Sequence, residues 1–256
     1  MTATTATDVL PGWSPGSFTA AGITHATYRR GSGPPVIVIH EVPGITPKVT
    51  EFADDVVAAG FTVVMPLLVG VAGKEASVGY GLQSMLKVCI SKEFTNWALR
   101  KTSPVISWLR ALATSLHNEL GGTGVGAVGM CFSGGFALGM MVDDIMVAPV
   151  LSQPSLPFAA GINSKVRGAD LNLSPDDELI VAERAAAGCQ VLGLRFTGDK
   201  LVGSRFATLR TLLGDAFIAV ELPSVGKRDH SVLTEQRDEP SVTTVLDFLR
   251  DKLAPA

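Results

Sequence analysis

The sequence predicts an α/β fold with a mostly parallel central sheet and helices on both faces. Short apolar runs alternate with amphipathic segments from about residue 35 to the C-terminus, which is typical of this fold class. The β-branched run at 36–39 indicates a strand that is buried on both faces. The 256 residues are 46% hydrophobic and 18% charged, with no break in composition. We therefore expect one domain over residues 35–256, with residues 1–34 packing on it as an N-terminal segment.

Three Ser/Thr-Pro pairs mark the expected helix starts: Thr46-Pro47, Ser103-Pro104 and Ser174-Pro175. The hydroxyl residue suits the N-cap and the proline suits the first helical position. Helices are expected at 47–60, 104–119, 175–188 and 242–253. Strands are expected at 36–40, 61–65, 125–130, 145–150, 190–196 and 217–222. Residues 69–101 are the least regular, and we expect them to form part of a lid or a wall of the substrate site.

Composition excludes several classes of function. The net charge of −3 and the lack of any Lys/Arg run offer no surface for nucleic acid. Three scattered cysteines form neither a disulfide framework nor a zinc motif. The first residues, MTATTATDVLPGWSPG, lack a signal peptide pattern, so a cytoplasmic location is expected. Mean hydropathy is +0.33 and residues 120–142 carry no charge, but eight glycines in that run favour a buried strand and helix over a membrane span.

The most informative motif is residues 125–135, VGAVGMCFSGG. It predicts a buried strand, a sharp turn with Cys131 at its apex, and a helix start, which is the layout of a nucleophile elbow. A nucleophile forced toward positive φ needs small neighbours two positions away, and these are Gly129 and Ser133. The helical amides that begin at Phe132 would face an anion formed beside the thiol. Two alternatives remain: Ser133 is the nucleophile, or Cys131 is a buried structural residue.

A catalytic thiol needs a base and an orienting carboxylate. Of the four histidines, His25 and His117 are expected to be surface or structural residues. His230 lies in a polar loop after the last expected strand, and Asp199 follows the strand at 190–196. Loops at the carboxyl ends of parallel strands are where sites form. The order Cys131, Asp199, His230 is therefore that of a nucleophile–acid–histidine triad.

These residues give the chain a resemblance to the dienelactone hydrolase family of the α/β-hydrolase superfamily. It is carried by 129–135 (GMCFSGG), 39–44 (IHEVPG), 197–199 (TGD) and 229–231 (DHS), and it extends from about residue 35 to the C-terminus. The resemblance implies that Cys131 is the nucleophile, His230 the base and Asp199 its orienter. It also implies that Glu41 is the family's extra acid, which contacts the resting thiol and shifts when substrate arrives. The oxyanion hole would be the backbone amides of Phe132 and Val42.

The chain departs from the family in two places. Ser133 stands where the family usually has glycine, and no arginine follows His230 closely, although family members bind a substrate carboxylate with arginines. Lys92, Arg100 or Arg205 could take the place of these arginines as a clamp for a substrate carboxylate. A carboxylate such as Glu41 beside a thiol would disfavour free thiolate and guard it from oxidation. His40 is expected to brace the strand end.

The sequence therefore predicts a hydrolase of small carboxylic esters or lactones that acts through a Cys131 thioester. No metal or cofactor is implied, the partner is a small-molecule substrate, and the protein is expected to be a monomer or a homodimer. The alternatives are a non-catalytic protein of the same fold that binds a ligand, and a redox sensor that uses Cys131.

Overall fold

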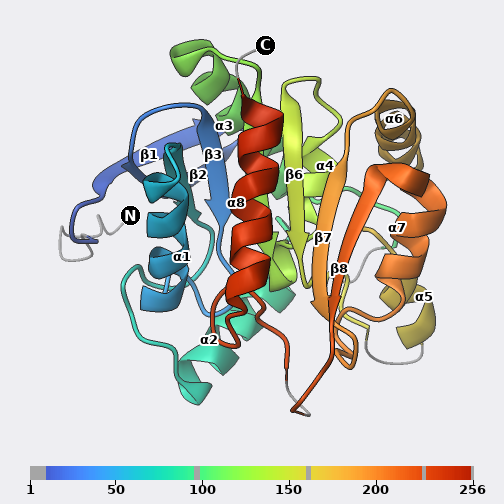
Figure 1. Ribbon diagram of the computed structural model, residues 1–256. Helices are drawn as coiled ribbons and strands as arrows, with labels where there is room; N and C mark the ends of the chain where they lie inside the picture. The colour runs from blue at the N-terminus through green and yellow to red at the C-terminus, as the bar shows by residue number, and fades with distance from the viewer. Residues whose placement is uncertain (1–9, 95–98, 160–162, 227–228, 255–256) are drawn as a thin grey trace.

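The computed structural model describes residues 10–94, 99–159, 163–226 and 229–254. These residues form an eight-stranded sheet with helices on both faces (Figure 1). The predicted α/β class is confirmed. In chain order the elements are β1 (Ser14–Ala20), β2 (Ile23–Arg30), β3 (Pro35–Ile39), α1 (Pro47–Ala58), β4 (Thr62–Leu67), α2 (Val78–Ile90), α3 (Pro104–Leu120), β5 (Val125–Met130), the 3₁₀ turn η1 (Cys131–Ser133), α4 (Phe136–Met140), β6 (Met146–Ser152), α5 (Ser164–Ala169), α6 (Pro175–Ala186), β7 (Val191–Phe196), α7 (Arg205–Leu213), the 3₁₀ turn η2 (Gly214–Ala216), β8 (Phe217–Leu222) and α8 (Glu239–Leu253).

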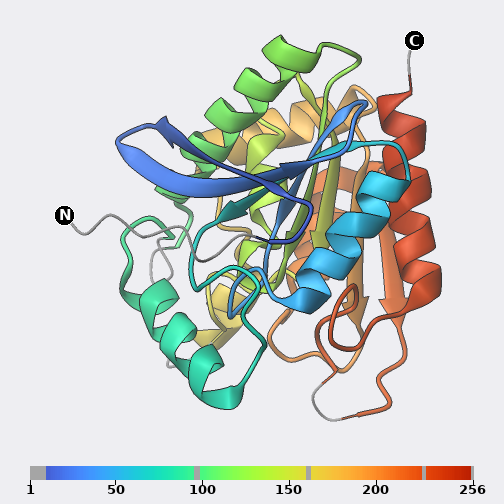
Figure 2. The ribbon, with the colours of Figure 1, turned by 90° about the vertical axis from the view of Figure 1, so that its left-hand side faces the viewer.

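The strands lie in the order β1-β2-β4-β3-β5-β6-β7-β8. From β4 to β8 each neighbouring pair is parallel, whereas β2 runs antiparallel to both β1 and β4. The β1–β2 hairpin was not expected from the sequence. It extends the sheet along the edge beside β4, so β1 and β2, which lie within the first 34 residues, belong to the same sheet as the rest of the chain (Figure 2).

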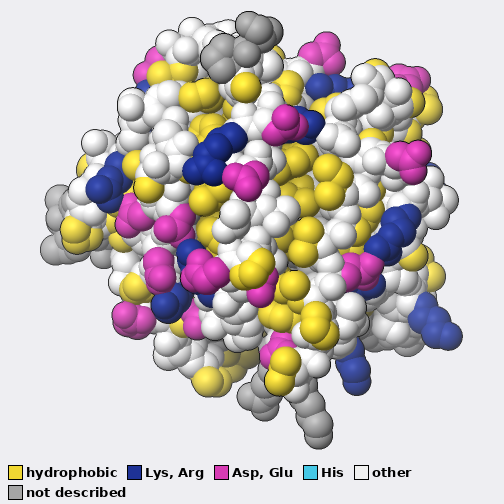
Figure 3. All heavy atoms as spheres, in the orientation of Figure 1, with side chains coloured by type: hydrophobic (Ala, Val, Ile, Leu, Met, Phe, Trp, Pro, Cys, Tyr) yellow, Lys and Arg dark blue, Asp and Glu magenta, His cyan; other side chains and the backbone are white. Residues whose placement is uncertain are grey.

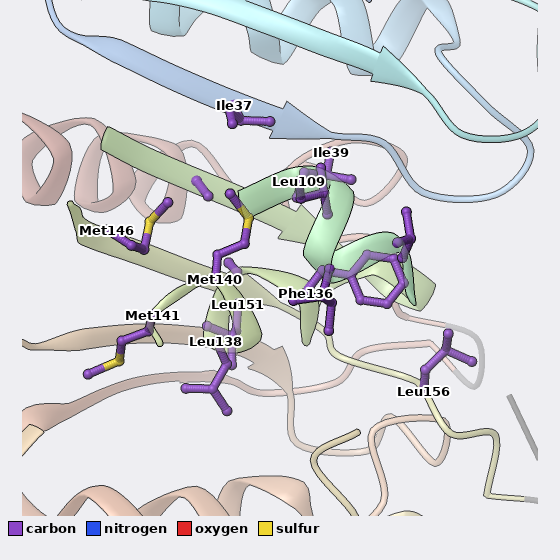
Figure 4. Packing of buried hydrophobic residues seen from close by; sticks show 14 of the residues in the cluster. Ile37, Ile39, Leu109, Phe136, Leu138, Met140, Met141, Met146, Leu151 and Leu156 are labelled. Carbon is purple, nitrogen blue, oxygen red and sulfur yellow. The ribbon is translucent and has the colours of Figure 1, made fainter. Parts of the chain in front are cut away.

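The buried run of β3 explains why helices cover both faces. Its alternate side chains point in opposite directions, as in any strand. Val36 and Val38 pack in the core beneath α1 and α8, and Ile37 and Ile39 pack in the core beneath α3 and α4. All four are fully buried. Figure 4 shows the second of these cores, where the side chains of α4 meet β3, β5 and β6.

The Ser/Thr-Pro pairs start helices as predicted, but they do so in two ways. The hydroxyls of Thr46 and Ser174 accept hydrogen bonds from backbone amides in the first turns of α1 and α6. Ser103 makes no such cap. Its hydroxyl is buried and bonds instead to the carbonyl of Phe94 and the side chain of Asn172. Ser103 therefore ties the start of α3 to two neighbouring loops.

Two further features of the fold were not predicted. Helices α5 and α7 are short and lie in stretches with little apolar periodicity. Helix α2 occupies the middle of the segment that was expected to be irregular, and it exposes Val78, Leu82, Leu86 and Ile90 along one side. The part of the 69–101 segment at residues 95–98 lies outside the described residues.

On the face covered by α1 and α8, acidic and basic side chains are interspersed among apolar ones (Figure 3). Within the ranges that the structure describes, no helix combines the length and the hydropathy that a bilayer crossing requires. The carboxyl ends of the parallel strands point toward the lower edge of the sheet in Figure 1. The loops that follow β3, β5, β6, β7 and β8 all leave from that edge, and they carry the residues of the candidate site.

Candidate active site

Cys131 lies at the apex of a tight turn directly after β5. Its φ is 55°, in the left-handed region that residues other than glycine rarely adopt. The turn leaves no room at Gly129, where a Cβ atom would overlap the carbonyl oxygen of Ser133 and lie 3.0 Å from its carbon. The Cys131 carbonyl accepts hydrogen bonds from the amides of Gly134, at 2.9 Å, and Ser155, at 3.0 Å. The geometry is that of a nucleophile elbow held from both sides.

Ser133 is a fully buried part of this turn. Its Oγ accepts a hydrogen bond from the Met130 amide at 2.9 Å, and lies 2.9 Å from the carbonyl oxygen of Ile39 and 3.0 Å from that of His40, to which the hydroxyl can donate. The side chain therefore fastens the elbow to the end of β3. Because this hydroxyl is surrounded by backbone groups, its environment disfavours the alternative in which Ser133 is the nucleophile.

Asp199 and His230, which are 31 residues apart in the chain, meet beside the elbow. His230 Nδ1 lies 2.6 Å from Asp199 Oδ2, so the carboxylate assigns a proton to that ring nitrogen. The other carboxylate oxygen accepts a hydrogen bond from the Leu201 amide at 3.0 Å. Asp199 is only 8% exposed, which strengthens its interaction with the ring.

The other ring nitrogen of His230 faces Cys131. Nε2 is buried and has no hydrogen-bond partner within the normal distance limits among the described residues, and the His230 ring interacts with the Cys131 side chain. Burial alone lowers the pKa of His230, but the nearby Cys131 side chain and the hydrogen-bonded Asp199 carboxylate outweigh it and raise the pKa to about 11. The imidazole ring of His230 is therefore protonated near neutral pH.

Glu41 follows β3 and is 4% exposed. Its Oε2 accepts hydrogen bonds from the Ser231 hydroxyl at 2.7 Å and from Gln153 Nε2 at 3.2 Å, and its Oε1 accepts one from the Thr234 hydroxyl. Burial raises its pKa, while the two hydroxyls and the charge of His230 counteract that rise. The carboxylate is thus bonded to the loop after His230, and none of its hydrogen bonds is to the thiol, with which the family resemblance implied a contact.

His40 is fully buried, and its ring braces the strand end as expected. Nδ1 lies 2.7 Å from the Glu41 carbonyl, and Nε2 accepts hydrogen bonds from the amides of Leu68 and Val69. Burial lowers its pKa to about 4, so the ring is neutral.

The two remaining histidines lie apart from these contacts. His25 is on β2, 3.3 Å from Glu93 and edge-on against Trp108. His117 is in the last turn of α3.

The backbone amides expected to form the oxyanion hole lie on the two loops that Ser133 joins. Phe132 is the residue after Cys131 in the 3₁₀ turn, and its ring packs edge-on against Phe94. Val42 comes directly after Glu41, precedes a cis peptide bond, and packs against the same core as Cys131.

The three residues considered as a clamp for a substrate carboxylate lie in different environments, and none of them is described in contact with the elbow. Arg205 is 1% exposed, and its guanidinium donates to six backbone carbonyls. The prediction that it contacts substrate is wrong, because every donor direction is used inside the fold. Arg100 is exposed and lies 3.6 Å from Glu178. Lys92 is exposed in the turn after α2. None of the contacts described for these side chains is to the elbow.

Sequence reasoning missed Gln153, which follows β6 and contacts Glu41. A glutamine-proline pair directly after an apolar strand was the available signal, since a buried polar residue at a carboxyl strand end needs partners there. In the part of the chain that the structure describes, no three His, Cys, Asp or Glu residues are grouped so that they could hold a metal ion. Neither Cys131 nor Cys189 forms a disulfide with another described residue.

Comparisons with known proteins identify the family and the fold of the chain. The sequence model of the dienelactone hydrolase family matches residues 22–156. No curated protein matches the sequence significantly. Among solved structures, a Klebsiella pneumoniae protein assigned as a dienelactone hydrolase has a TM-score of 0.62 at 17% identity, covering 94% of this chain and 98% of its own.

Two esterases share the same architecture. A cold-adapted esterase from an Arctic intertidal metagenomic library has a TM-score of 0.60 at 17% identity, with 93% of both chains covered. The bacterial brefeldin A esterase has a TM-score of 0.56 at 14% identity, with 99% of this chain and 80% of that chain covered. At such identities the structures establish the fold, while the family match spans more than half of the sequence. The chain therefore belongs to the dienelactone hydrolase family and has the α/β-hydrolase fold.

Proposed function

We propose that the protein hydrolyses small carboxylic esters or lactones through a thioester formed on Cys131. Membership of the dienelactone hydrolase family supports ester or lactone hydrolysis in general. The observation that carries the finer proposal is the placement of His230 between Asp199, at 2.6 Å, and the Cys131 side chain. This is the geometry of a nucleophile, a base and an orienting acid.

In the first half of the proposed reaction, the Cys131 thiolate attacks the carbonyl carbon of the substrate. The electron pair of the carbonyl moves to its oxygen, which the amides of Phe132 and Val42 would hold. The intermediate collapses when the bond to the leaving oxygen breaks, and the His230 imidazolium protonates that oxygen. For a lactone the leaving alcohol stays attached to the acyl group.

In the second half, water attacks the thioester carbon and gives a proton to His230. The carbon–sulfur bond then breaks, which releases the carboxylic acid and returns the thiolate–imidazolium pair. Asp199 keeps Nδ1 protonated throughout, so that Nε2 is the atom that exchanges the proton. Each oxyanion donor in such a site contributes a factor of about 100 to 1,000 to kcat.

The experiment is a comparison of ester hydrolysis by Cys131→Ala, His230→Ala and Asp199→Asn, with His117→Ala as the matched control. Each triad variant is expected to fold normally and to lose at least about 100-fold in kcat/KM. His117 lies on the far part of α3, so its variant should retain wild-type activity. Near-full activity of Cys131→Ala or His230→Ala would refute the proposal.

A further inference from the structure

Gln153 is an unusual residue in an unusual conformation. It follows the last residue of β6, is fully buried, and has φ of 36°, in the left-handed region. Such a conformation is strained for a residue with a Cβ atom, and it persists only where surrounding contacts fix it. Its backbone amide donates to the Leu194 carbonyl at 2.7 Å, which extends the pairing of β6 with β7.

The side chain of Gln153 uses both ends of its amide. Nε2 donates to Glu41 Oε2 at 3.2 Å, and Oε1 accepts from the Val232 backbone amide at 3.3 Å and from the Ser152 hydroxyl. Val232 lies two residues after His230. One side chain therefore joins the end of β3 to the histidine loop, across 112 and 79 residues of sequence.

The backbone next to Gln153 reaches the elbow as well. Two residues further on, the Ser155 amide donates to the Cys131 carbonyl at 3.0 Å, and the Ser155 hydroxyl donates to the Gln153 carbonyl at 2.9 Å. The loop after β6 thus contacts the nucleophile turn through its main chain and the histidine loop through the Gln153 side chain. Gln153 is the residue at which these contacts meet.

We propose that Gln153 is a positioning residue that sets the His230 loop against the Cys131 elbow and, together with Ser231 and Thr234, holds Glu41 in that loop's hydrogen-bond network. The proposal rests on the function proposed above. The residue type suits the contacts: a side-chain amide donates to the Glu41 carboxylate through Nε2 and accepts from the Val232 backbone amide through Oε1 at the same time. A glutamate here would place two carboxylates in contact, and an apolar side chain would remove one of the hydrogen bonds to Glu41 and the side-chain acceptor of the Val232 amide.

The test compares Gln153→Met, which keeps the length but not the amide, with Asn172→Ala as the control. Asn172 is another buried amide at a positive φ, 59°, and its side chain bonds to Ser103 rather than to the site. Both variants should be less stable to urea than the wild type. Only Gln153→Met should lose kcat, by about tenfold to 100-fold with KM within about threefold, because a displaced base affects the chemical step.

A second readout does not depend on hydrolysis. The rate of Cys131 alkylation by iodoacetamide, followed by peptide mass mapping, reports how close His230 stays to the thiol. In Gln153→Met the pH at which this rate is half-maximal should rise by about one pH unit, since the imidazolium no longer stabilises the thiolate as well. In Asn172→Ala it should stay at the wild-type value.

Gln153→Glu replaces Gln153→Met as the test variant if the methionine variant does not fold. Its activity relative to the wild type should rise as the pH falls, because protonation of one carboxyl restores the donor toward the other. Wild-type kcat and an unshifted alkylation profile in Gln153→Met would overturn the inference, as would a flat activity ratio for Gln153→Glu. If the wild type does not hydrolyse esters, the proposed function fails, and the alkylation profiles still decide whether Gln153 positions His230.

Discussion

Adding one methyl group at Gly129 is a sharp test of the elbow geometry. A Cβ atom there would overlap the Ser133 carbonyl oxygen and lie 3.0 Å from its carbon and 3.1 Å from Gly134 Cα. All three are backbone atoms of the turn that follows Cys131, so no flexible side chain can move aside. The turn itself must shift, and it carries both Cys131 and the Phe132 amide.

The size of the effect follows from that geometry. Forcing extra volume into a packed core costs about 1 to 3 kcal/mol, and more where the neighbours are rigid. For a domain of this size each kcal/mol lowers the Tm by about 2 to 4 °C, so Gly129→Ala should melt about 2 to 12 °C lower. A displacement of about 1 Å at the reacting group would also reduce kcat by about 100-fold.

Gly135→Ala is the matched control, because its Cβ atom would meet only the Leu171 carbonyl oxygen, at 3.6 Å, an ordinary contact. It should keep the Tm within about 2 °C and kcat/KM near the wild-type value. Thermal melts and hydrolysis of p-nitrophenyl acetate measure both variants. Equal behaviour of Gly129→Ala and Gly135→Ala would refute the close approach described at the elbow.

Three further predictions concern other parts of the molecule. Burial lowers the pKa of His40 to about 4 from an ordinary 6.5, so between these two pH values the unfolded chain binds a proton that the folded chain does not. The free energy of unfolding should therefore fall by about 3 kcal/mol as the pH drops from about 6.5 to about 4. Urea melts of wild type and His40→Asn that lose stability in parallel would contradict this. Arg205→Leu should lower the free energy of unfolding by more than about 3 kcal/mol, because buried carbonyls lose their donor. The ratio of kcat/KM for anionic over neutral esters should stay unchanged in this variant, and a fall in that ratio would show that Arg205 does bind a substrate carboxylate. Neutral short-chain aryl esters should be hydrolysed at least as well as an anionic dienelactone, since a lost bidentate contact costs about 1.5 to 3 kcal/mol; a dienelactone preference above about 100-fold would point to Lys92 or Arg100.

The parts of the fold that the sequence predicted are those with strong local signals. The continuous apolar runs of β3 and β5 and the Thr46-Pro47 and Ser174-Pro175 starts needed no tertiary information. The β1–β2 hairpin was missed because β1 is mostly exposed and lacks a regular apolar alternation. Helix α7 was missed for a related reason, since its apolar face is weakly marked.

The residues of the candidate site were likewise predictable only where the sequence carried a local signal. The chain order of Cys131, Asp199 and His230 indicated residues that the fold does bring together. Arg205 misled because a charge in the sequence does not reveal burial. The partners of Glu41 could not be predicted, since they lie between 112 and 193 residues away and depend on how three loops meet.

The central claim is that catalysis passes through a thioester on Cys131, and trapping that species tests it most directly. The enzyme is mixed with excess p-nitrophenyl acetate, quenched in acid during turnover, and examined by intact mass and peptide mapping. We predict one added acetyl group, located on Cys131, that is lost when turnover is allowed to finish. An acetyl group on any other residue, or steady hydrolysis by Cys131→Ala without any acylated enzyme, would contradict the account.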